Sequence, residues 1–136
     1  MHNTILVPVD MAHIDETHEV LRVAKLNSGE NCRIVLLNVI EDIPGWAAAQ
    51  LPRGTLDTIQ QSNREKLEEL VAAANCPVEI EVRAGHAYQM ILAMAEEISA
   101  DLIIIASHRP GFKEFYLGST AAKVVRHAKC SVYVHR

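Results

Sequence analysis

The chain has 136 residues, of which 49% are hydrophobic and 22% are charged, and its formal net charge is -4. This is the balance of a single globular domain that can bury its own core, which excludes a disordered chain. The lack of a basic surplus argues against nucleic acid as the main ligand. The apolar runs are far shorter than the ~20 residues that span a bilayer, so we expect no membrane span.

The predicted elements alternate along the chain between strands and helices. Apolar runs rich in β-branched residues predict strands over 5–9, 34–40, 78–82, 102–106 and 132–134. Apolar residues at helical spacing predict helices over 17–26 and 90–98, a helix marked from Leu56 and Ile59 on through 60–74, and a last one from Gly118 towards His127. This alternation is typical of parallel strands joined by right-handed helical crossovers. We therefore expect one α/β domain over 1–136, a three-layer sandwich, with the connection 41–55 lying over its surface as an insertion or lid.

The N-terminus enters the first strand pattern at once, so no signal peptide is expected. The three cysteines are Cys32, Cys76 and Cys130, and their wide spacing is typical neither of a disulfide framework nor of a zinc site. Reduced thiols in the cytosol are the simplest interpretation.

In an open parallel sheet, ligands bind beyond the carboxyl ends of the strands, where the strand order reverses. Asp10 is the carboxylate that follows the first predicted strand. Such a carboxylate can accept a hydrogen bond from a ribose hydroxyl or help to hold a metal, but aspartate is also a good N-cap for the next helix. The sequence leaves both roles of Asp10 open.

The segment 106–120 leaves the fourth predicted strand and ends in Gly118-Ser119-Thr120 at a helix start. Free backbone N–H groups beside a glycine and two hydroxyls form an anion site. Arg109 and Lys113 add positive charge to the same loop. The alternative is that Ser119 only caps the helix and that both cations are solvated.

Several better-known sites are missing from the sequence. There is no P-loop, no dinucleotide-binding Gly-x-Gly-x-x-Gly after the first strand and no Gly-x-Ser-x-Gly nucleophile elbow. The histidines form no pair four residues apart and no cluster with cysteine, so we expect no dedicated metal site and assign no catalytic residue.

Together these segments resemble the universal stress protein family over essentially the whole chain. The resemblance rests on Ile-Leu-Val-Pro-Val-Asp at 5–10, Leu-Asn-Val-Ile at 37–40, Gly85, and the run from Gly118-Ser119-Thr120 to Val-Tyr-Val at 132–134. It implies a five-stranded parallel sheet in the order 3-2-1-4-5, the adenine nucleotide alpha-hydrolase-like fold. It also implies a homodimer through antiparallel pairing of the last strands, Ser131 to His135, which would cover an exposed strand edge.

Family members that bind ATP look like Gly-x-x-Gly, nine residues, then Gly-Ser/Thr. This chain keeps Gly118-Ser119 but has His108 ten residues earlier and Ala106 near the place of the first glycine. It is similar to the F/G-type branch, which is associated with ATP binding despite the same departure. Our hypothesis is that Arg109 replaces the lost amide contacts by a charge-assisted contact with phosphate. The nucleotide-site residues that the resemblance implies are Pro8, Val9, Asp10, Val39, Ala106, His108, Arg109, Gly118, Ser119 and Thr120.

The resemblance implies a cytosolic, dimeric, ATP-binding sensor or regulator of a stress response, with Mg²⁺ carried by the phosphates. No base is evident to activate water, so we expect at most slow ATP hydrolysis or self-phosphorylation at Ser119 or Thr120. The alternative is a nucleotide-free interaction module of the same fold, which the missing glycines favour. A flavin carrier and a phosphoacceptor receiver fit less well, because Asp10-Met-Ala-His follows the first strand and supplies a single acidic residue at the strand's end.

Overall fold

The five predicted strands form one sheet, in which every neighbouring pair is parallel and the order is β3-β2-β1-β4-β5. The computed structural model describes residues 1–41, 47, 49–107 and 117–136. The sheet order and the fold class expected from the resemblance are confirmed. The strands are β1 (His2–Val9), β2 (Ser28–Glu41), β3 (Glu79–Gly85), β4 (Leu102–Ala106) and β5 (Ser131–His135).

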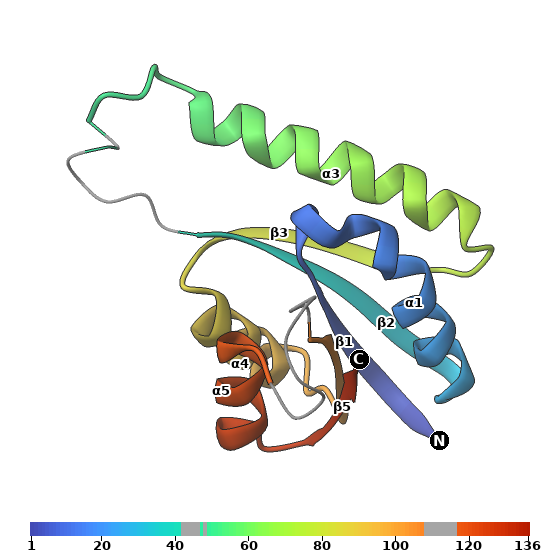
Figure 1. Ribbon diagram of the computed structural model, residues 1–136. Helices are drawn as coiled ribbons and strands as arrows, with labels where there is room; N and C mark the ends of the chain where they lie inside the picture. The colour runs from blue at the N-terminus through green and yellow to red at the C-terminus, as the bar shows by residue number, and fades with distance from the viewer. Residues whose placement is uncertain (42–46, 48, 108–116) are drawn as a thin grey trace.

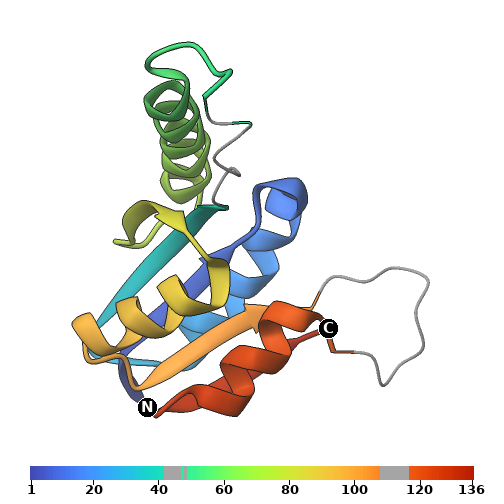
Figure 2. The same cartoon turned by 90° about the vertical axis from the view of Figure 1, so that its left-hand side faces the viewer.

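Helices cover both faces of this sheet (Figures 1 and 2). On one face, α1 (Thr17–Leu26) and α3 (Thr55–Ala73) bury Val20, Leu21 and Leu67 against alternate strand residues. On the other, α4 (Ala87–Glu97) and α5 (Ser119–His127) bury Ile91 and Val124. Because successive strand side chains point to opposite faces, a fully buried strand must be apolar throughout. The central strands are therefore read directly from the sequence.

A polar segment extends one of the predicted strands. β2 begins at Ser28 rather than at residue 34, and its first residues pair with β1 through an irregular register between His2 and Thr4. The helix that Leu56 and Ile59 mark, expected on through 60–74, is confirmed as Thr55–Ala73, although Leu56 and Ile59 are exposed. The added part of β2 is largely exposed, so hydrophobic patterning does not define where that strand begins.

Two local features shape the carboxyl edge of the sheet. A 3-10 helix, η1 (Met11–Glu16), separates β1 from α1 and was not expected. Gly85 ends β3 at φ +152°, and a Cβ there would lie 2.9 Å from Cγ of Met90. Glycine is therefore the residue that this turn accommodates without strain.

Part of the connection expected as an insertion or lid, residues 42–46 and 48, lies outside the described residues. Among the helices that are described, none combines the length and the apolar character needed to cross a membrane. The cysteines Cys32, Cys76 and Cys130 are all unpaired.

Candidate functional site

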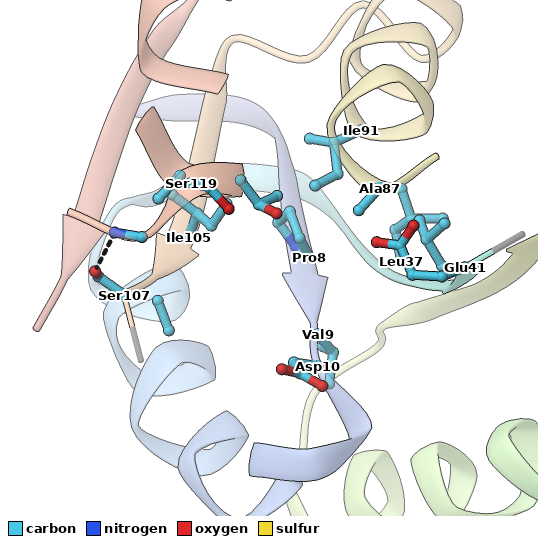
Figure 3. A pocket seen from close by; sticks show the side chains of 15 residues that line it. Pro8, Val9, Asp10, Leu37, Glu41, Ala87, Ile91, Ile105, Ser107 and Ser119 are labelled. Carbon is cyan, nitrogen blue, oxygen red and sulfur yellow. Dashed lines mark hydrogen bonds between the residues drawn. The ribbon is translucent and has the colours of Figure 1, made fainter. Parts of the chain in front are cut away.

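A cavity of about 300 Å³ lies at the carboxyl edge of the sheet, around the ends of the adjacent strands β1 and β4. Chain connections leave β1 and β4 in opposite directions along the sheet, which makes this the switch point of the fold. The ends of β1, β2 and β4 and the first turns of α4 and α5 supply its walls (Figure 3). The location is the one expected for a ligand site.

The structure brings together every predicted site residue that it describes. All of these residues line the same cavity, and they are Pro8, Val9, Asp10, Val39, Ala106, Gly118, Ser119 and Thr120. The two other predicted residues, His108 and Arg109, lie outside the described residues, as does Lys113.

Seven further residues line the cavity but were not predicted. They are Leu37, Glu41, Ala87, Ile91, Ile105, Ser107 and Ala121. Strand alternation offered a signal for Leu37 and Glu41, because residues two apart on β2 share a face with Val39. The α4 residues had no local signal, since only the packing of α4 on the sheet brings them to the cavity.

The start of α5 differs from the cap considered from the sequence. Gly118 is the N-cap residue and Ser119 is the first residue of the helix, with no side-chain hydrogen bond capping it, so the capping role of Ser119 is wrong. The Gly118 N–H donates to Oγ of Ser107 at 3.2 Å, which ties the helix start to the end of β4 (Figure 3). The N–H groups of Ser119, Thr120 and Ala121 have no acceptor within the helix, because its first turn offers none. These amides and two hydroxyls make the helix start attractive to an anion.

Of the two roles that the sequence left open for Asp10, the structure shows the helix cap. Its Oδ1 accepts a hydrogen bond from the Ala12 N–H at 3.0 Å, which confirms the capping role. Its Oδ2 lies 3.2 Å from Nδ1 of His13. The carboxylate nevertheless lines the cavity and is 56% exposed, so it keeps acceptor capacity for a ligand.

The two ends of the cavity offer different groups to a ligand: amides and hydroxyls at one end, and a carboxylate at the other. Ser119 at the start of α5 lies on one side, and Glu41 at the end of β2 lies across from it (Figure 3). Oε2 of Glu41 is 3.7 Å from Nδ1 of His86, and both side chains are exposed. Apolar strand residues, among them Val9, Leu37 and Ile105, also line the cavity. Such a lining suits a ligand with a flat apolar ring, hydroxyls that donate to a carboxylate, and an anionic group.

A family model and a curated relative that match this chain name the same protein family. A family model described as "Universal stress protein family" matches residues 1–136. The chain is 30% identical over 145 residues to universal stress protein G of Escherichia coli O157:H7, and the match covers 100% of both chains.

Solved structures share the fold at lower identity. A universal stress protein in complex with cAMP has a TM-score of 0.68 and 18% identity, covering 99% of this chain and 97% of that one. The Archaeoglobus fulgidus protein in complex with dAMP has a TM-score of 0.67 and 20% identity, covering 98% of both chains. At these identities the structural likeness concerns the fold alone.

Proposed function

Because the chain belongs to the universal stress protein family, we propose that it binds ATP in the cavity at the carboxyl edge and acts as a stress-response sensor or regulator. The observation that supports this proposal is the lining of that cavity. An apolar floor, a carboxylate at the end of β1 and an uncapped helix start meet around one space of about 300 Å³. That volume lies at the lower end of the range for small-molecule sites. Two related folds have been solved with cAMP and with dAMP.

Each part of the lining has a part of the nucleotide to hold. Pro8 and Val9 would pack against the adenosine, and the backbone of Val39 would meet the adenine edge. Asp10 would accept hydrogen bonds from the ribose hydroxyls. At the other end, the amides and hydroxyls of Ser119 and Thr120 would hold phosphate oxygens.

We propose binding rather than fast turnover. Among the described residues, no group of three or more His, Cys, Asp or Glu side chains is placed to hold a metal ion. Mg²⁺ would therefore be carried by the ATP phosphates and waters, which it prefers as ligands, and would neutralise phosphate charge there. Hydrolysis would be slow at most, and Ser119 or Thr120 would be the hydroxyl that accepts phosphate in any self-phosphorylation.

We also propose a cytoplasmic homodimer joined through β5. This strand is at the end of the sheet order, and Tyr133 on it is 42% exposed. Antiparallel pairing of Ser131–His135 with the same strand of a second copy would satisfy the outer backbone edge. Sedimentation velocity at micromolar concentration should give a dimer, whereas a monomer would contradict this part of the proposal.

The test is a thermal-shift series with ATP, ADP, AMP, cyclic AMP and FMN, each with and without Mg²⁺. ATP at a hundredfold its dissociation constant should stabilise the fold by about 2.7 kcal/mol, which raises the melting temperature by several degrees. Gly118→Val should abolish the shift by narrowing the approach to the helix start. The backbone there has φ −55°, and among the described residues an added Cβ meets Oγ of Ser107 at 3.9 Å and no other atom within 4 Å, so this variant should still fold.

Val125→Ala is the matched control, because Val125 is exposed on the same helix and does not line the cavity. Arg109→Ala tests the phosphate contact expected from the sequence, and unchanged ATP affinity would refute that hypothesis. No shift with any ligand, in protein free of co-purified nucleotide, would favour the interaction module instead.

A further inference from the structure

A buried amide side chain lies directly behind the proposed nucleotide site. Asn38 on β2 is 3% exposed, and its neighbours Leu37 and Val39 both line the cavity. Because strand side chains alternate, Asn38 points to the opposite face, where α1 and α3 pack. A buried amide is unfavourable unless its polar atoms are hydrogen-bonded. Asn38 is the polar residue within the apolar run 34–40 of β2, so its burial needs a specific explanation.

The partners of Asn38 fix the direction of its amide group. Its Nδ2 donates to the backbone carbonyl oxygen of Val9 at 3.1 Å. Its Oδ1 accepts from Nδ2 of Asn63, which lies on α3, at 2.9 Å. Since a carbonyl oxygen can only accept, the NH₂ group of Asn38 must face Val9, and its oxygen needs the donor that Asn63 supplies. The two side chains link α3 to the end of β1 in one defined orientation.

Asn38 donates to the carbonyl oxygen of the peptide unit that joins Val9 to Asp10. Val9 is the last residue of β1, and its Cα partner on β2 is Asn38 itself. A peptide unit is planar, so fixing the Val9 oxygen also fixes the direction of the Asp10 N–H and Cα. The Ala12 amide then holds the Asp10 carboxylate from the other side. The position of Asp10 in the cavity thus depends on a contact made outside it.

We propose that Asn63 and Asn38 are positioning residues, a relay through which α3 sets the geometry of Asp10 and so the affinity for a ligand with ribose hydroxyls. This inference rests on the proposed function, because it assigns those hydroxyls to Asp10. The relay touches no nucleotide itself. It makes the affinity of the site depend on the seating of α3, a helix that does not line the cavity.

The test is the affinity of Asn63→Asp for ATP and for 2′,3′-dideoxy-ATP, by titration calorimetry. Asn63→Asp keeps the side-chain size but replaces the donor with an acceptor. Asn38 should then turn its NH₂ group towards residue 63 and its oxygen towards the Val9 carbonyl. We expect ATP affinity to fall roughly tenfold, the size of one lost charge-assisted hydrogen bond. Dideoxy-ATP, which lacks both hydroxyls, should lose less than about twofold.

Gln61→Glu is the matched control, since Gln61 is exposed on α3 and also donates its amide to an oxygen, Oε1 of Glu65. It should leave both affinities unchanged. If Asn63→Asp does not fold, Asn63→Ala removes the donor without adding a charge, and a smaller loss confined to ATP is expected.

Equal losses for the two nucleotides, or none in a folded variant, would overturn the relay. Failure of the wild type to bind ATP would overturn the proposed function first, and with it the role of Asp10 that the relay serves. The two failures are therefore distinguishable.

Discussion

The two edges of the sheet use the same chemical groups in different ways. At the amino edge, Asp101 precedes β4 and accepts hydrogen bonds from the N–H groups of Asn3 at 2.8 Å and Thr4 at 3.2 Å. Its own N–H donates to the Thr4 carbonyl at 2.9 Å. At the carboxyl edge, Asp10 takes one amide, and the first amides of α5 lack acceptors within their helix. The amino-edge carboxylate therefore binds amides of a neighbouring strand, whereas the hydrogen bond that Asp10 accepts from Ala12 is local to its own turn.

The cavities at the two edges also differ in volume. The amino-edge cavity is about 140 Å³, less than half the volume of the other, and an ion pair between Lys129 and Glu96 at 2.6 Å lies beside it. Cys130 also lines it. Burial raises the pKa of the Cys130 thiol, and the negative charge of Asp101 raises it further. A thiol kept protonated is a poor nucleophile, so nothing in the surroundings of Cys130 activates it.

The largest expected effect contrasts the two aspartates. Asp101→Ala should lower the free energy of unfolding by about 2 kcal/mol, because two backbone amides lose a charged acceptor that is only partly exposed. Asp10→Ala should cost about 0.5–1 kcal/mol, as expected for one exposed helix cap. Urea denaturation without nucleotide, at neutral pH, measures both. Equal losses, or a larger loss at Asp10, would break the contrast between the edges.

A smaller effect should appear in acid. Burial by itself would raise the pKa of Asp101, but the amides of Asn3 and Thr4 and the nearby His2 outweigh it and hold that pKa below its ordinary value. A lowered pKa in the folded state stabilises the fold above the ordinary aspartate pKa, and this contribution is lost as pH falls through the lowered value. Below about pH 4, the urea midpoint of the wild type should therefore fall more steeply than that of Asp101→Asn. Parallel curves would show that this carboxylate does not favour folding through its charge.

The smallest effect is expected at the ion pair beside the amino-edge cavity. The hydrogen bond from Lys129 lowers the pKa of Glu96, but the two side chains are 82% and 61% exposed. Exposed pairs contribute little because water and salt screen them. Lys129→Ala should leave the urea midpoint unchanged within error, at low and at moderate salt. A clear loss of stability would show that this pair closes the cavity and that the amino edge depends on more than Asp101.

The order of strands and helices could be predicted from the sequence. A buried parallel strand must be apolar on both faces, and a helix must repeat its apolar side about every 3.6 residues. The sequence also located the carboxyl edge, since Asp10 and Gly118-Ser119-Thr120 directly adjoin predicted elements. The resemblance to a family added the sheet order, which is confirmed. The polar start of β2 was missed because exposed residues leave no such pattern.

The hydrogen bonds between different elements depend on tertiary packing. Ser107 accepts a hydrogen bond from the Gly118 amide, eleven positions further along the chain. Asn63 donates to Asn38, which lies 25 positions earlier. Neither hydrogen bond can be predicted from sequence spacing, because each depends on how a helix packs on the sheet. Glu41 lies opposite the start of α5, which is distant in the chain, and this arrangement also depends on packing. Local periodicity specifies elements, whereas the polarity of the site arises from contacts between elements that only packing brings together.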